Sequence, residues 1–118
     1  MSQGSTRKTL ASIAHGRSGD KGNHANVAIL GYSQDAFDWL IGFLSKEKVE
    51  DYFKPLGVTQ VERYLAPNVR GLNFVLKDVL AGGSSASLRS DSQGKTLAAA
   101  LLLMPLPPDC PARLFFKG

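Results

Sequence analysis

Apolar side chains recur at the three- and four-residue spacing of an amphipathic helix in four parts of the chain. The four sets are Phe37, Leu40, Ile41 and Leu44; Val49, Tyr52, Phe53 and Leu56; Leu72, Val75, Leu76 and Val79; and Leu97, Leu101 and Met104. Ser33, Ser45 and Asn68 precede the first three sets, in positions where such side chains cap helices. Gly57 and Gly82 follow the second and third sets, where glycine ends helices. The spacing predicts a helix pair over residues 34–56, a third helix over 72–79 and a last helix over 95–104.

Four other segments have the composition of strands, namely residues 8–14, 27–32, 58–66 and 84–90. The second of them is apolar at both parities, as expected for a strand covered on both faces. The resulting order is strand, strand, two helices, strand, helix, strand, helix. This order predicts an α+β two-layer sandwich of the ferredoxin-like or split βαβ kind, in which helices cover one face of a roughly four-stranded, mainly antiparallel sheet.

Residues 15–26 form a strongly polar stretch between two apolar segments. Gly16, Gly19 and Gly22 allow sharp turns there and leave backbone N–H groups open, while Arg17 and Lys21 add positive charge. Two interpretations of this stretch are equally supported. The stretch is either a pocket-lining loop that cradles an anionic or polar group of a ligand, or a solvated connection between adjacent strands. The glycine spacing is neither a Walker A loop nor a complete GxGxxG motif.

The same stretch contains the candidate catalytic groups. His15 or His24 beside Asp20 has the residue types of a general acid–base pair. The spacing of the two histidines matches no metal-binding motif, so no metal is expected. Ser18 lacks the context of a nucleophile elbow, and a serine among glycines more often forms a turn. Asp20 next to Lys21 is expected to order the stretch.

Three residues outside the stretch complete a candidate binding set. Arg89 follows a Gly- and Ser-rich segment and suits two-pronged recognition of a carboxylate or phosphate, although a structural salt bridge to Glu62 or Asp20 is a slightly better interpretation. Asn68 and Asn73 individually suit capping or loop bracing. The full candidate ligand-binding set is Arg17, Ser18, Gly19, Asp20, Lys21, Gly22, Asn26, Asn68, Asn73 and Arg89.

Composition narrows the functional classes. The chain has 118 residues, 43% hydrophobic and 20% charged, which is typical of one globular domain. The net charge of +4 is scattered along the chain, so we expect no nucleic-acid partner. Cys110 is the only cysteine, which excludes an intrachain disulfide and fits a reducing cytoplasm. No stretch reaches the roughly 20 apolar residues of a membrane span, and no membrane partner is expected.

The two ends of the chain differ from its middle. Residues 1–7 are polar and expected to be disordered. The tail over residues 105–118 holds four of the six prolines, so it should be extended or irregular. Its Leu114-Phe115-Phe116 cluster must pack on this domain or on a partner. The expected domain is therefore residues 8–104.

Several motifs, taken in order, resemble those of the AtuA-like ferredoxin-fold domain. They are Arg17-Ser18-Gly19-Asp20-Lys21-Gly22-Asn23, Ala25-Asn26-Val27, Val61-Glu62-Arg63-Tyr64, Pro67-Asn68, Leu72-Asn73-Phe74-Val75-Leu76, Gly82-Gly83, Ser87-Leu88-Arg89, Asp91 and Gln93-Gly94-Lys95. The similarity covers roughly residues 9–104. It implies a ferredoxin-like fold without an iron–sulfur cluster or other cofactor. It also implies a setting of acyclic terpenoid or branched acyl-CoA breakdown, where such a domain commonly follows a larger acyclic terpene utilisation domain.

Three hypotheses follow. In the first, the chain is an accessory or assembly domain, forming a homo-oligomer or joining a larger AtuA-type domain, with the polar stretch at an interface or anion-binding pocket. In the second, it is a small hydratase or hydrolase for an acyl-CoA or branched carboxylic acid, with Asp20, His15 or His24 as acid or base and with Lys21 and Arg89 holding the anion. In the third, it is a structural oligomer subunit that makes contacts through its sheet face and tail. The first is favoured because no activated nucleophile or coherent acid–base pair is evident.

Overall fold

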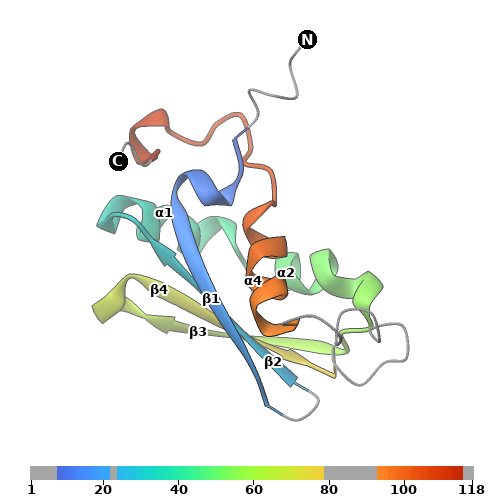
Figure 1. Cartoon of the computed structure of the whole chain (residues 1–118). Helices are drawn as coiled ribbons and strands as arrows, with labels where there is room; N and C mark the ends of the chain where they lie inside the picture. The colour runs from blue at the N-terminus through green and yellow to red at the C-terminus, as the bar shows by residue number, and fades with distance from the viewer. Residues whose placement is uncertain (1–7, 22–23, 79–92, 116–118) are drawn as a thin grey trace.

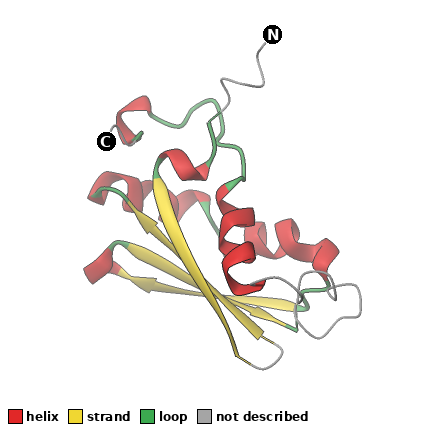
Figure 2. Ribbon diagram, in the orientation of Figure 1, coloured by secondary structure: helices red, strands yellow, loops and turns green. Residues whose placement is uncertain are grey.

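A single antiparallel sheet organises the computed structural model, which describes residues 8–21, 24–78 and 93–115 (Figure 1). Its four strands lie in the order β1-β2-β4-β3. In chain order the elements are η2 (Leu10–Ser12), β1 (Ala14–Lys21), β2 (His24–Gly31), α1 (Gln34–Phe43), α2 (Lys46–Phe53), η3 (Lys54–Leu56), β3 (Gln60–Ala66), η4 (Pro67–Val69), β4 (Gly71–Lys77), α4 (Gln93–Leu102) and η6 (Ala112–Leu114). The helices lie on one side of the sheet (Figure 2). The predicted α+β sandwich with a four-stranded antiparallel sheet is therefore confirmed.

Residues 15–21 and 24–26 of the polar stretch lie in the paired strands of the β1–β2 hairpin, so the prediction of a loop there is wrong. Strands β1 and β2 pair along their whole length, from Ala14 opposite Gly31 to Lys21 opposite His24. The predicted strand over residues 8–14 is also wrong, because its centre forms the short helix η2. The polar stretch can form β1 because the helix-facing side of this strand needs few apolar residues. Its helix-facing positions include Gly16, where an added Cβ would lie 3.0 Å from the Ala28 carbonyl oxygen and 3.5 Å from Leu102 of α4.

Residues 71–77 are strand β4, so the predicted third helix is wrong. Its apolar residues fit either helical spacing or strict alternation, and pairing with β2 and β3 on both sides selects the strand. Leu72, Phe74 and Leu76 are buried beneath the helices. Asn68 caps no helix, because it lies in the short turn η4 before the left-handed residue Arg70, whose φ is 56°. The predicted helix end at Gly82-Gly83 and the predicted strand over residues 84–90 lie outside the described residues.

The other helices confirm the sequence prediction. The Ser33 hydroxyl accepts a hydrogen bond from the Ala36 N–H at the start of α1, and the Ser45 hydroxyl accepts one from the Lys48 N–H at the start of α2, each at 3.1 Å. Gly57 ends the second segment with a φ of 91°. Helix α4 closes over β1 and β2. Neighbours in the chain specify α1 and α2 through caps and periodic apolar residues. The predicted last helix over residues 95–104 is α4, which begins and ends two residues earlier.

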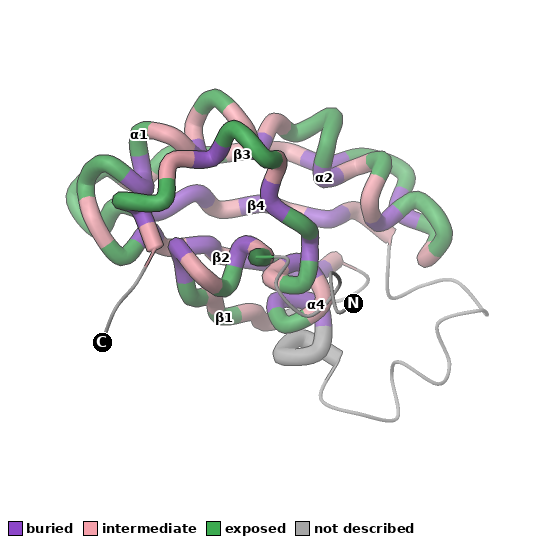
Figure 3. The backbone as a smooth tube through the Cα atoms, turned by 90° about the horizontal axis from the view of Figure 1, so that it is seen from above, coloured by how far each residue is buried: buried purple, intermediate pink, exposed green. Residues whose placement is uncertain are grey.

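The hydrophobic core lies between the sheet and this helical layer. Each helix contributes residues buried against the sheet, including Phe37 and Leu40 of α1, Val49 and Phe53 of α2, and Leu97 and Leu101 of α4. Along β2 and β4 the buried residues alternate with more exposed ones (Figure 3). That alternation shows that the opposite face of the sheet is open.

The C-terminal segment packs on its own domain. The Leu106 N–H donates to the Lys8 carbonyl at 2.9 Å, and the Leu10 N–H donates to the Met104 carbonyl at 3.0 Å. Leu114 is 4% exposed and belongs to the core. Apart from η6, residues 105–115 of this segment are irregular, as the prolines predict. Of the cluster expected to pack on the domain or a partner, Leu114 therefore packs on the domain. No helix in the described part of the chain combines the length and hydropathy needed to span a bilayer.

Candidate functional site

The open face of the sheet gathers polar residues from three strands. Side chains of a strand alternate between the two faces, and residues paired across strands share a face. Arg17 of β1 lies opposite Ala28 of β2, which lies opposite Asn73 of β4. In the next row, Gly19 lies opposite Asn26. The strand register, rather than proximity in the chain, therefore brings Arg17, Asn26 and Asn73 together.

These residues surround a shallow hollow with a volume of about 240 Å³. It is lined by Arg17, Ser18, Gly19, Asn26, Ala28 and Asn73. Small residues produce the depression, because Gly19 has no side chain and a Cβ there would meet nothing within 4 Å. Ala28 contributes only a methyl group. The hollow is thus an apolar floor with two carboxamides and one guanidinium around it.

Arg17 brings a positive charge to this hollow. Within the described residues the ion pairs join Lys77 to Glu62 at 3.5 Å and Arg113 to Asp35 at 3.6 Å, and neither involves Arg17. A guanidinium presents a planar fork of N–H donors that matches a carboxylate or phosphate. The carboxamides of asparagine can donate to the same anion through N–H groups. The arrangement can therefore bind the anionic end of a ligand.

A separate polar cluster occupies the β3 side of the open face. The Tyr64 hydroxyl donates to a Glu62 carboxylate oxygen at 2.7 Å, and Lys77 lies on the other oxygen. The Tyr64 hydrogen bond and the Lys77 charge hold the pKa of Glu62 below its usual value. The same contact with Glu62 raises the pKa of Tyr64. Because Glu62 is engaged with Tyr64 and Lys77, it is not the counter-ion of Arg17.

The two histidines lie far apart, at opposite ends of the β1–β2 hairpin. His15 lies opposite Leu30, whereas His24 lies opposite Lys21, at the other end of β1. Lys21 is six residue steps along β1 from His15, or about 20 Å at the rise of an extended chain. The His15 ring packs against Tyr32 at a centroid distance of 5.1 Å. The Nδ1 atom of His24 accepts a hydrogen bond from the Asp78 N–H at 3.2 Å, so this nitrogen is engaged with the backbone.

Other members of the candidate set have different surroundings. Ser18 lines the hollow, but its hydroxyl accepts the Ala98 N–H of α4 at 3.0 Å and so braces the helix against β1. Asn68 is exposed in η4 and does not line the hollow. Asp20 lies opposite Ala25 in the hairpin register, as Lys21 does opposite His24. The side chains of Asp20 and Lys21, together with Gly22 and Arg89, lie outside what the structure describes.

The sequence prediction omitted Ala28. Asn26, Ala28 and Leu30 share one parity of β2, while Ala25, Val27 and Ile29 share the buried one. Reading this segment as a strand covered on both faces concealed the open side. Among the described residues, no group of three histidine, cysteine, aspartate or glutamate side chains is placed to hold a metal ion.

Comparison with known proteins gives one match. The family model for the AtuA ferredoxin-like domain matches residues 8–107. The searches of curated proteins and of solved structures found no match. The matched region contains all four strands, the described helices α1, α2 and α4, and the open-face hollow.

Proposed function

The chain belongs to the AtuA ferredoxin-like domain family, and from this premise we propose that it is an accessory binding domain of acyclic terpenoid or branched acyl-CoA catabolism. The observation that carries the proposal is the open-face hollow, where Arg17 lies beside the carboxamides of Asn26 and Asn73. The domain holds the carboxylate or phosphate end of a ligand there. Its role is to bind and present that group rather than to transform it.

The size of the hollow favours an end group over a whole ligand. At about 240 Å³ it is smaller than the roughly 300–1,000 Å³ typical of pockets that enclose a complete small molecule. A branched carboxylic acid places its carboxylate on Arg17, and an acyl-CoA places a phosphate there. In both cases the remainder of the ligand extends over the open sheet face.

Binding is favoured over a hydratase or hydrolase because neither candidate histidine lines the hollow. His15 and His24 lie at opposite ends of the hairpin, and neither lines the hollow. Ser18 is hydrogen-bonded to the backbone of α4. General acid–base catalysis needs its groups within hydrogen-bonding reach of one reacting atom, and these three side chains do not share such a point.

The experiment is a melting-curve and isothermal titration series with isovalerate, isovaleryl-CoA and inorganic phosphate. A ligand at 100 times its dissociation constant should stabilise the fold by about 2.7 kcal/mol. Arg17→Gln should weaken binding by about tenfold or more, because a charge-assisted pair is lost. Asn73→Asp should weaken it similarly by placing a negative charge in the hollow.

Arg113→Gln is the matched control, because it removes an exposed arginine far from the hollow and should leave binding unchanged. Isovalerate tests the carboxylate and phosphate tests the phosphate group, whereas isovaleryl-CoA carries phosphates but holds its acyl carboxyl as an uncharged thioester. If none of the three compounds shifts the melting curve, or if Arg17→Gln and Arg113→Gln bind equally well, the proposal is wrong.

Self-assembly is a second candidate role, supported by exposed apolar side chains around the β3 corner. Tyr64 is 53% exposed, Leu65 44% and Val69 51%, although such residues are more often buried. They lie beside the sheet edge formed by β3, and free edges readily pair with another chain. Light scattering should then give a mass above the 12.7 kDa of one chain, and Leu65→Lys should lower it. A mass of one chain at high concentration would exclude self-assembly.

A further inference from the structure

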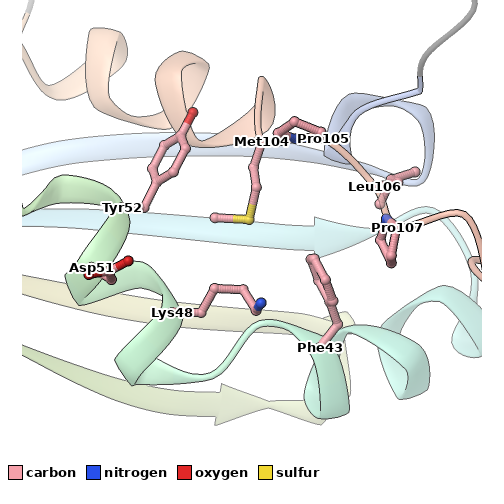
Figure 4. A pocket seen from close by; sticks show the side chains of 8 residues that line it. All are labelled: Phe43, Lys48, Asp51, Tyr52, Met104, Pro105, Leu106 and Pro107. Atoms are coloured by element: carbon pink, nitrogen blue, oxygen red, sulfur yellow. The ribbon is translucent and has the colours of Figure 1, made fainter.

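A second hollow, with a volume of about 340 Å³, lies in the helical layer on the other side of the sheet (Figure 4). It is bounded by the end of α1, by α2 and by the segment that follows α4. The residues used below are Phe43, Lys48, Asp51, Tyr52, Met104 and Leu106. We call this hollow the helix-side groove. It shares no residue with the open-face hollow.

The floor of the helix-side groove is apolar and held in place. Met104 and Leu106 are each 6% exposed. Backbone hydrogen bonds from Leu10 to the Met104 carbonyl and from Leu106 to the Lys8 carbonyl fix this segment. The Tyr52 hydroxyl donates to the Ala100 carbonyl at 2.7 Å. This hydrogen bond engages the hydroxyl, which is the only polar group of the Tyr52 side chain, and the ring forms an apolar wall of the groove.

Lys48 brings one cation to this apolar site. Its Nζ lies 4.6 Å from the centre of the Phe43 ring, and Figure 4 shows the side chain extending across the groove toward Phe43. No described carboxylate lies within ion-pair distance of this ammonium. Asp51 is on the same helix but lies toward the other end of the groove (Figure 4). The groove therefore combines apolar walls with a positive charge beside Phe43.

We propose that the helix-side groove binds an aliphatic monocarboxylate of medium chain length. The carboxylate pairs with the Lys48 ammonium, and the hydrocarbon chain lies on Met104 and Leu106. Burial of apolar surface holds the hydrocarbon chain in the groove, and the charge fixes the direction of the chain. A second carboxylate at the far end of the chain would lie on apolar side chains without a partner, so a dicarboxylate of equal length is disfavoured. The volume is at the small end for ligand pockets, so it suits a single aliphatic chain and is too small to enclose a complete acyl-CoA.

The test uses the full chain and sodium octanoate as probe, followed by two-dimensional amide NMR. Octanoate should shift the amide signals of Tyr52, Met104 and Leu106 with saturation. Octan-1-ol should bind at least fivefold more weakly because it lacks the charge, and suberate should bind more weakly because it carries a second one. Lys48→Gln should weaken octanoate by about tenfold. Lys46→Gln is the matched control, because Lys46 is exposed on the same helix and does not line the groove.

Several results would overturn the proposal. If Lys48→Gln and Lys46→Gln bind octanoate equally, or if octanol binds as well as octanoate, Lys48 does not recognise a carboxylate and the proposal is wrong. Shifts confined to Asn26 and Asn73 would also overturn it, since they would place octanoate on the open face. Arg17→Gln separates this proposal from the proposed function, because it removes the open-face cation and should leave octanoate in the helix-side groove unaffected.

Discussion

Arg63 joins the sheet to the helical layer, and its removal provides the sharpest test of how the layers are held together. From β3 its Nη1 atom donates to the carbonyl oxygens of Ile41 and Leu44 at 2.9 and 3.0 Å. These carbonyls lie at the C-terminal end of α1, where helical partners run out. The guanidinium thus caps the helix and places positive charge at the negative end of its dipole.

The expected loss for Arg63→Met can be derived from these contacts. Hydrogen bonds to a charged group contribute about 1.5–3 kcal/mol, and the dipole adds about 0.3–1 kcal/mol. Methionine keeps an apolar stem, so most of the loss is polar. Since the site is half-buried and water can reach part of it, we expect the free energy of unfolding to fall by about 2–3 kcal/mol. Arg63→Lys should lose less because it keeps the charge.

Urea unfolding followed by the fluorescence of Trp39 measures this loss, because Trp39 is the only tryptophan and lies in α1. Arg113→Met is the matched control. Its pair with Asp35 spans 3.6 Å with both side chains about two-thirds exposed, so removing it should cost less than about 0.5 kcal/mol. If Arg63→Met costs no more than Arg113→Met, the two hydrogen bonds do not hold α1 to the sheet.

Two further predictions concern glycine packing and tyrosine ionisation. Gly31→Ala should destabilise the fold by about 1–3 kcal/mol, because the new Cβ would lie 2.8 Å from the Phe37 nitrogen. Gly42→Ala lies in open space within α1 and should stabilise the fold by about 0.5–1 kcal/mol. Equal melting temperatures for the two variants would contradict the packing argument. Burial raises the pKa of Tyr52 above its ordinary value of about 10, so the contribution of its neutral hydroxyl is complete below that value and is lost as the pH rises through the folded-state pKa. Urea unfolding from about pH 9 to 12 should therefore show a steeper loss for the native chain than for Tyr52→Phe, and parallel profiles would refute this.

The polar residues of the candidate site show how much of it the sequence predicts. Arg17, Gly19, Asn26 and Asn73 were all selected, and the register brings all four to one hollow. Asn68 was selected with them but belongs to a turn that does not line it. No local rule separates these cases, because pairing between β2 and β4 decides which residues share a face.

The sequence alone determined the features that depend on neighbours in the chain. Ser33 and Ser45 mark the starts of α1 and α2 because a cap needs only a side chain and an N–H three residues later. The ordered motifs identified the AtuA ferredoxin-like family. The caps can be predicted because they depend only on residues close in the chain. The family can be predicted because its motifs are compared directly between sequences.

The tertiary structure alone decided the nature of the two polar or ambiguous segments and the location of both hollows. The stretch over residues 15–26 is too polar to read as a strand by itself, yet small residues such as Gly16 let α4 cover one of its faces. Residues 71–77 fit a helix or a strand until β2 and β3 supply partners on both sides. A strand obtains its hydrogen bonds and its buried face from residues distant in the chain, whereas a helix obtains its hydrogen bonds from within itself.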